Sequence, residues 1–136
     1  MAQGNLLVVD DDECVRRLLM EYLSERSSMH VDGARDGVEA LHQIAIKSYA
    51  VIVLDVMMPY MSGIDFLTSL EALLSDPSVR SLDDPPAVLV ITSAPQEDVG
   101  ADELQRRFPR FIRGVMRKPL DIPALGERVA ALSGAG

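Results

Sequence analysis

Two of the most apolar stretches in the chain stop abruptly at aspartate. Asn5–Val9 runs into Asp10–Asp12, and Ala50–Leu54 runs into Asp55. Short, continuous apolar runs of this kind are typical of strands that are buried on both faces of a parallel sheet. An acid that directly follows such a strand lies at the carboxyl edge of the sheet, where open α/β folds bind their ligands. The pattern therefore favours an α/β fold with a polar site at that edge.

Three more segments have the character of strands. They are Met29–Ala34, Ala87–Ile91 with Thr92 after it, and Ile112–Arg117 with Lys118 and Pro119 after it. Apolar residues recur at helical spacing in Val15–Leu23, Val38–Ala45 and Ile64–Leu74, and shorter helices are expected near Glu97–Arg107 and Asp121–Ala131. The polar segment Ser75–Pro86, which holds three prolines, is expected to be a long loop. Because parallel strands need crossover connections, we expect a single doubly wound five-stranded parallel sheet, (βα)5, with helices on both faces.

The length, the charge and the hydropathy of the chain exclude several classes of function. At 136 residues it has the size of one domain. The net charge of −8 repels phosphate backbones, so direct binding to nucleic acid is not expected. No apolar run is long enough to span a bilayer, and the N-terminus does not have the form of a signal peptide. We therefore expect a cytoplasmic protein that binds neither nucleic acid nor a membrane.

Cys14 is the only cysteine and cannot form a disulfide within the chain. Because free cysteines commonly pack as small apolar residues, we expect Cys14 to be mostly buried in its helix. His30 and His42 are expected at the surface, away from the site.

The expected sheet brings five polar side chains to one edge. They are Asp10, Asp11, Asp55, Thr92 and Lys118. Three carboxylates at one edge raise one another's pKa unless a cation neutralises them, and an all-oxygen set of ligands suits Mg²⁺. Lys118 adds a fixed positive charge, and Thr92 offers a hydroxyl donor to a phosphoryl oxygen. Asp55 is alone at the end of its strand, which makes it the best candidate for a carboxylate nucleophile towards phosphorus.

Each of these residues also has an ordinary structural explanation. Asp10–Asp12 is suited to capping the helix that follows. Asp55 is suited to a turn, Thr92 to a helix cap and Lys118 to a solvated strand end. For Asp55, Thr92 or Lys118 taken alone, the structural explanation is the stronger one, and for Asp10–Asp12 the two explanations are about equally good. Their joint occurrence at successive strand ends is what favours a functional site.

The same segments resemble the receiver domain of bacterial response regulators over essentially the whole chain. The residues that carry the resemblance are Leu6-Leu7-Val8-Val9-Asp10-Asp11-Asp12, then Val53-Leu54-Asp55-Val56-Met57-Met58-Pro59 with Gly63 after it, then Ile91-Thr92-Ser93, and then Arg117-Lys118-Pro119. The resemblance implies a flavodoxin-like fold with strand order 2-1-3-4-5. It also implies one receiver domain over residues 1–136, with its core at about residues 5–132.

The resemblance further implies the roles of the site residues. Asp55 accepts a phosphoryl group from the phosphohistidine of a histidine kinase in a Mg²⁺-dependent reaction. The implied Mg²⁺ ligands are Asp11 directly, Asp10 largely through water, Asp55, and the backbone carbonyl of Met57. The implied catalytic partners are Thr92 and Lys118, and the implied structural positions are Gly63 and Pro119, with a cis peptide bond before Pro119.

One family position departs from the usual pattern. Receiver domains usually carry an aromatic residue three positions before the conserved lysine, and together with the threonine it reports phosphorylation. Here that residue is Val115. Valine has one stiff torsion, so it cannot transmit a signal by swinging a ring. The Thr92 half of the switch remains.

The leading hypothesis is a phosphorylation-controlled binding switch in two-component signalling, not a turnover enzyme. Its expected partners are a sensor histidine kinase or phosphotransfer protein and an unknown downstream protein, with a phosphorylation-dependent homodimer as a further option. No effector segment follows the domain, so we expect output through a partner protein or a missing C-terminal segment. The alternative is a receiver-like interaction module that is never phosphorylated. A phosphatase with an aspartyl nucleophile is disfavoured, because the acid that such enzymes carry two residues after the nucleophile is here Met57.

Overall fold

A computed structural model describes residues 4–56, 61–76, 85–92 and 100–133 of the chain, with the backbone alone for residues 100–102. Its five strands are β1 (Asn5–Val9), β2 (His30–Ala34), β3 (Val51–Asp55), β4 (Ala87–Thr92) and β5 (Ile112–Arg117). Neighbouring strands are parallel, and their order is β2-β1-β3-β4-β5. The predicted fold and strand order are confirmed, and each of these strands begins and ends within one residue of its predicted bounds.

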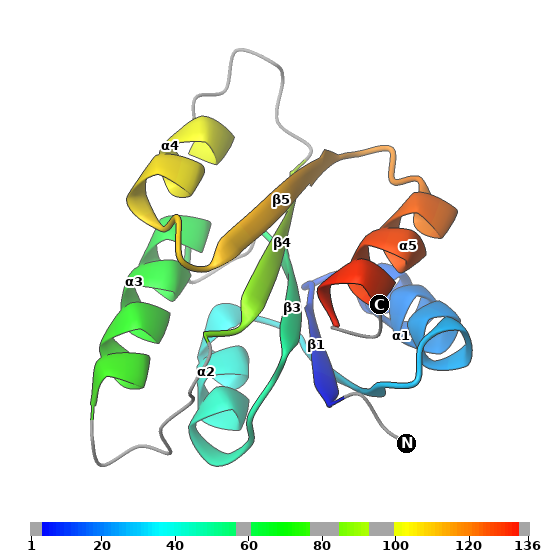
Figure 1. Cartoon of the computed structure of the whole chain (residues 1–136), viewed down its shortest axis with the longest axis horizontal. Coiled ribbons are helices and arrows are strands. Elements are labelled where there is room, and N and C mark those ends of the chain that lie inside the picture. The colour runs from blue at the N-terminus through cyan, green and yellow to red at the C-terminus, as the bar shows by residue number, and fades with distance from the viewer. Residues whose placement is uncertain (1–3, 57–60, 77–84, 93–99, 134–136) are drawn as a thin grey trace.

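Helices cover both faces of this sheet (Figure 1). The helices α1 (Glu13–Arg26) and α5 (Ile122–Leu132) pack on one face, and α2 (Gly37–Ile46), α3 (Gly63–Ser75) and α4 (Gly100–Arg107) pack on the other. The strands send alternate side chains into these two apolar cores, so β1, β3 and β4 are buried on both faces. This double burial explains their continuous apolar sequence. Within the described residues, no helix combines the length and the apolar character that a membrane span needs.

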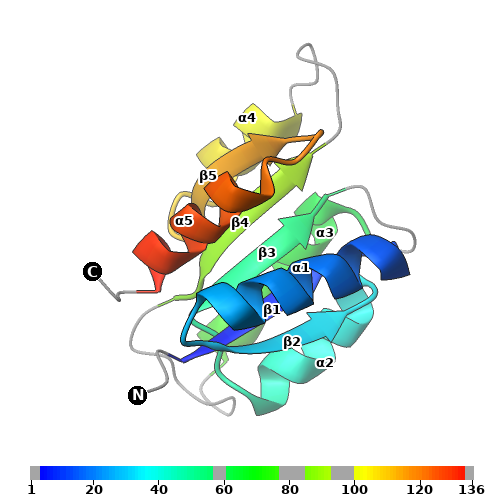
Figure 2. The same cartoon turned by 90° about the vertical axis from the view of Figure 1, so that its right-hand side faces the viewer.

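The helices α1 and α5 contact each other on their face of the sheet, and Figure 2 shows both helices from that side. A Cβ at Gly126 of α5 would lie 3.0 Å from Cε1 of Tyr22 in α1. A glycine inside a helix costs about 1 kcal/mol relative to alanine. The close approach of the tyrosine ring accounts for a glycine at this position.

Side-chain caps fix where four helices begin. The capping residues are Asp12, Asp36, Ser62 and Asp121, and each accepts a hydrogen bond of 2.8–3.1 Å from the backbone N–H three residues later. Such a cap satisfies one of the free donors in the first turn of a helix. Asp12 thus has the capping role that was the structural alternative for Asp10–Asp12, and α1 begins directly after it.

The expectations for α1 are partly wrong. Cys14 is exposed and not buried, because it lies about 100° around the helix from Val15, at the side away from the buried stripe. Leu18 belongs to the expected apolar stripe but is 52% exposed, whereas Leu19 and Leu23 are buried. His30 and His42 are exposed, as expected.

Some expectations fall on residues outside those described. These are Met57, residues 77–84 of the expected loop, and residues 97–99 of the helix expected from Glu97. Within the described residues, that helix is α4, from Gly100 to Arg107.

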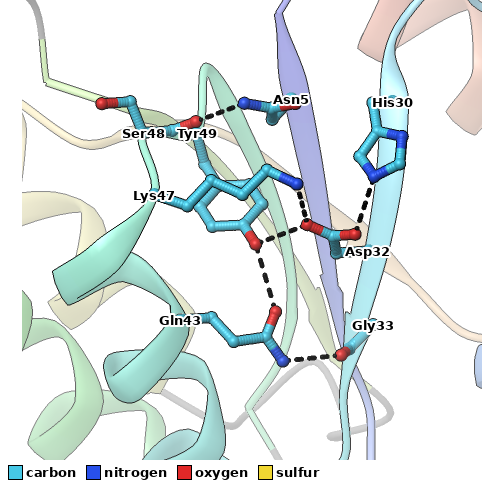
Figure 3. Close-up of polar contacts among 8 residues, drawn as sticks. All are labelled: Asn5, His30, Asp32, Gly33, Gln43, Lys47, Ser48 and Tyr49. Carbon is cyan, nitrogen blue, oxygen red and sulfur yellow. Dashed lines mark hydrogen bonds and ion pairs between the residues drawn. The ribbon is translucent and has the colours of Figure 1, made fainter.

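A network of polar side chains around Asp32 holds the edge strand β2 (Figure 3). The Asp32 carboxylate accepts hydrogen bonds from Lys47 Nζ at 2.8 Å and from the Tyr49 hydroxyl at 2.6 Å. It also pairs with His30 Nε2 at 3.1 Å. Gln43 of α2 donates to a backbone carbonyl of β2 at 2.9 Å and extends the network. Side chains from β2 and from the segment between α2 and β3 therefore meet at one carboxylate, an arrangement that was not predicted from the sequence.

Candidate functional site

Four of the predicted site residues lie at the carboxyl ends of neighbouring strands. Asp10 follows β1, Asp55 ends β3, Thr92 ends β4 and Lys118 follows β5. Asp55 pairs with Ile91 across the sheet, and the Lys118 N–H donates to the Thr92 carbonyl at 2.8 Å. Asp10, Asp55 and Thr92 are all buried. The structure therefore brings these residues together at one edge, as the strand order predicts.

Asp10, Asp11 and Asp55 form a compact group of carboxylates. One oxygen atom from each lies within 4.8 Å of the others. Asp10 and Asp55 are buried and Asp11 is exposed, so solvent reaches the group from the Asp11 side. Lys118 Nζ donates a hydrogen bond to Asp55 Oδ2 at 3.1 Å. The single charge of Lys118 balances at most one of the three carboxylates.

The protonation of Asp10 and Lys118 reflects this crowding. The pKa of Asp10 is raised, and burial is the largest cause. The hydrogen bond from the Asp12 N–H lowers this pKa, whereas the charge of Asp55 raises it further. Burial acts against the charged form of Lys118, but the hydrogen bond and the charge of Asp55 outweigh it, so the pKa of Lys118 is raised. Lys118 is therefore a fixed cation at neutral pH, whereas ionised Asp10 is destabilised by its surroundings.

A small divalent cation fits this group of residues. The donors are carboxylate oxygens, which Mg²⁺ prefers, and the exposed position of Asp11 leaves room for the waters that Mg²⁺ retains. A bound cation would also relieve the repulsion between Asp10 and Asp55. The backbone carbonyl of Met57, the remaining expected ligand, lies outside the described residues.

Hydrogen bonds fix the segment that carries Asp10 and Asp11. The Asp10 N–H donates to the Ala34 carbonyl of β2 at 3.1 Å, and Asp10 Oδ1 accepts from the Asp12 N–H at 2.9 Å. The Asp10 carbonyl accepts from Arg16 Nη1 at 2.9 Å. The contact of Arg16 was not predicted, because an arginine near the start of a helix gives no sequence signal of its partner.

The other predicted positions adjoin this edge of the sheet. A Cβ at Gly63 would lie 2.9 Å from Cγ1 of Val56, so glycine lets α3 begin against the residue that follows Asp55. The Lys118–Pro119 peptide bond is cis. Val115 packs against the apolar core on the face of α2, α3 and α4.

An apolar cleft of about 220 Å³ adjoins the carboxylate group, and Asp10 and Lys118 form part of its wall. Its apolar lining comes from α1, the end of β4 and the segment that leads from β5 into α5, and consists of Val15, Leu18, Leu19, Ile91, Pro119, Leu120 and Ile122. Leu18 is exposed because it lines this cleft. The acidic group therefore has an apolar surface directly beside it.

Known proteins share this sequence pattern and fold. Over 67 residues, the chain is 43% identical to the transcriptional regulatory protein SrrA of Staphylococcus aureus, a match that covers 49% of this chain and 27% of that protein. The chain thus spans about a quarter of the length of the curated relatives that it matches.

Solved structures cover nearly the whole chain. The receiver domain of the Francisella response regulator 1452 is 25% identical and superposes with a TM-score of 0.75, covering 97% of this chain and 98% of that one. The Vibrio cholerae chemotaxis protein CheY4 has the same fold at 22% identity, with a TM-score of 0.75 over 96% of this chain and 99% of that one. The family model of the response regulator receiver domain matches residues 6–130 of the sequence. The chain therefore belongs to the response regulator receiver domain family, the phosphoacceptor domains of two-component signalling.

Proposed function

We propose that this receiver domain is switched by phosphorylation of Asp55 in a Mg²⁺-dependent reaction. The observation that carries the proposal is the Asp55 carboxylate at the buried end of β3, 3.1 Å from Lys118 and grouped with Asp10 and Asp11. Membership of the family supports the same conclusion. The alternative of a receiver-like module that is never phosphorylated is not favoured, because such a module has no need of this set of residues.

In the proposed reaction, an oxygen of Asp55 attacks the phosphorus of a phosphohistidine, and the bond between phosphorus and the histidine nitrogen breaks. Lys118 supplies positive charge to the phosphoryl oxygens, and the Thr92 hydroxyl donates to one of them. Asp10, Asp11 and Asp55, with the backbone carbonyl two residues after Asp55, are the proposed ligands of Mg²⁺, which neutralises the charge between carboxylates and phosphoryl group when bound. The product is an acyl phosphate, so the domain changes state and is not a turnover enzyme.

The proposed phosphodonor is a sensor histidine kinase or a phosphotransfer protein. The apolar cleft beside Asp10 and Lys118 supports docking of such a protein, because it offers apolar contact area next to the acceptor. The proposed output is recognition of the phosphorylated state by a downstream protein, or pairing with a second copy. We assign the start of that signal to Thr92, since Val115 has no ring to reorient.

The proposal is tested by intact-mass measurement after incubation with a small phosphodonor, acetyl phosphate, with and without Mg²⁺. The wild-type chain is expected to gain one phosphoryl group in the presence of Mg²⁺. Asp55→Asn is expected to gain none, because an amide is nearly isosteric with the carboxylate but is not nucleophilic. Asp65→Asn, which changes an exposed aspartate of α3, is the matched control and should behave as wild type.

Two outcomes would contradict the proposal. Phosphorylation that persists in Asp55→Asn would show that another residue is the acceptor. A folded wild-type chain that gains no phosphoryl group and binds no Mg²⁺ would favour the alternative, a receiver-like interaction module that is never phosphorylated.

A further inference from the structure

Arg16 contacts the backbone between two of the three clustered carboxylates. Its Nη1 donates to the Asp10 carbonyl at 2.9 Å from the end of the first turn of α1. That carbonyl belongs to the peptide bond between Asp10 and Asp11. Because a peptide unit is planar, fixing its carbonyl also fixes the directions in which the two flanking residues continue. Arg16 therefore acts on both carboxylates at once without touching either of them.

We propose that Arg16 is a positioning residue of the metal site, which holds the Asp10–Asp11 peptide in the orientation that divalent-cation binding requires. The inference rests on the Mg²⁺ site of the proposed function. It adds a residue that the family resemblance does not assign and that lies outside the carboxylate group itself.

Asp11 depends on this anchor more than Asp10 does. The carboxylate of Asp10 is buried and accepts from the Asp12 N–H, and its own N–H donates to Ala34. Asp11 is exposed, so packing does not hold its side chain in one place. The position of its carboxylate therefore follows from the backbone on either side, which Arg16 holds at the Asp10 carbonyl and Asp12 holds at the start of α1.

The neighbouring strand leaves space for the Arg16 side chain. A Cβ at Gly33 of β2 would lie 3.3 Å from Cδ of Arg16 and 2.5 Å from Sδ of Met20. The absence of a side chain at this position lets Arg16 pass over β2 on its way to the carbonyl. Arg16 thus lies between α1 and β2, where it is partly buried.

Charge and geometry predict opposite effects for loss of Arg16, which makes the inference testable. Removing a positive charge near a cation site strengthens cation binding through simple electrostatics. Removing a group that orients the ligands weakens binding, and the loss of such an outer partner commonly costs 10–100-fold in metal affinity. The sign of the change therefore separates the two effects.

The experiment is calorimetric titration of the metal-free protein with Mg²⁺ at a temperature where every variant is folded by circular dichroism. Arg16→Gln is expected to bind Mg²⁺ on the order of tenfold more weakly than wild type. Arg17→Gln removes the same charge from the adjacent, exposed position of α1, and is expected to bind as tightly as wild type or slightly more tightly. Arg16→Lys keeps a donor on a long side chain and is expected to bind more tightly than Arg16→Gln.

The outcomes separate this inference from the proposed function. If Arg16→Gln binds Mg²⁺ as tightly as wild type or more tightly, or if Arg16→Lys binds more weakly than Arg16→Gln, the positioning role is wrong. In either case the metal site itself remains. If the wild-type chain does not bind Mg²⁺, or if Asp11→Ala binds it as well as wild type does, the proposed site is wrong and the inference fails with it.

Discussion

Asp32 is half-buried and Asp10 is buried in this fold, and their surroundings act on the two carboxylates in opposite directions. The carboxylate of Asp32 accepts hydrogen bonds from Lys47 and Tyr49 and pairs with His30 (Figure 3). Burial opposes its charge, but the hydrogen bonds from Lys47 and Tyr49 and the charges of Lys47 and His30 outweigh it and lower the pKa of Asp32. The fold thus stabilises the ionised form of this carboxylate.

The carboxylate of Asp10 has the opposite balance. It accepts one backbone hydrogen bond, from Asp12, and faces the charges of Asp55 and Asp11. Burial and these charges raise the pKa of Asp10 although Lys118 lies nearby. The fold thus destabilises the ionised form of Asp10. A bound cation would offset this repulsion.

The difference shows how one small fold uses carboxylates for two purposes. The network around Asp32 is complete, so it contributes to the stability of the edge strand and gains nothing from a ligand. The group around Asp10 brings three carboxylates together beside Lys118, and carboxylates with a raised pKa in such a group are typical of functional sites. The following predictions test whether this contrast is real, in order of decreasing effect.

The largest effect is expected for Mg²⁺ affinity in Asp11→Ala. The substitution removes a proposed ligand of Mg²⁺, so affinity should fall by at least about tenfold. Without metal, the variant should be as stable as wild type or more stable, because one of three mutually repelling charges is removed. Titration with Mg²⁺ and urea unfolding in a chelator measure the two quantities. A clear loss of metal-free stability would show that the acidic group is a structural network like that of Asp32.

A smaller effect is expected for the stability of Asp32→Asn. The variant loses the charge that orders Lys47 and Tyr49, and hydrogen bonds to charged groups contribute about 1.5–3 kcal/mol each when well buried. Because Lys47 is partly exposed, we expect a loss of about 1–2 kcal/mol in the free energy of unfolding. Urea unfolding with and without Mg²⁺ checks this, and the loss should be the same in both. Asp65→Asn is the control for removal of an exposed charge.

The pH dependence of that loss has a definite sign. The pKa of Asp32 in the folded protein is below its ordinary value of 3.8. Its contribution is therefore fully present above about pH 3.8 and is lost as the pH falls through the folded pKa. The difference in unfolding free energy between wild type and Asp32→Asn should shrink as the pH falls through the folded pKa of Asp32. A difference that grows towards acid would mean that the ionised form of Asp32 is not the stabilised one.

The contrast between the two clusters also explains what could be predicted from the sequence. The site could be found because strands buried on both faces are continuously apolar, so the acids that end them stand out, and the strand order then places them at one edge. The network of Asp32 could not be predicted from the sequence, because it depends on how β2 and the end of α2 meet in space. The β2 sequence, His-Val-Asp-Gly-Ala, is weakly apolar and gives no sign of which partners Asp32 meets.

Two residues of α1 show where local patterns stop being informative. Cys14 was predicted to be buried from the general behaviour of free cysteine, but its phase on the helix places it outward. Arg16 is one of several arginines in this helix, and only the three-dimensional path over Gly33 distinguishes it from Arg17. At both positions, residue type alone was therefore not enough to predict where the side chain lies.

The smallest effect, and the sharpest form of the comparison, is expected for Asp10→Asn in the absence of metal. This is the same substitution as Asp32→Asn, but the expected sign is reversed. The asparagine oxygen can still accept from the Asp12 N–H, while the buried charge beside Asp55 is removed. We expect the free energy of unfolding in a chelator to rise by a few tenths to about 1 kcal/mol.

The advantage of Asp10→Asn should disappear as Mg²⁺ is added, because wild type gains stability from the bound cation in proportion to the logarithm of its concentration above the Kd, and the variant gains less. Paired urea unfolding curves across a Mg²⁺ series measure this crossover. If Asp10→Asn is instead less stable than wild type without metal, the fold stabilises the ionised form of Asp10 as it does that of Asp32. The two clusters would then differ only in position, and the acidic edge of the sheet would not be held in a state that favours cation binding.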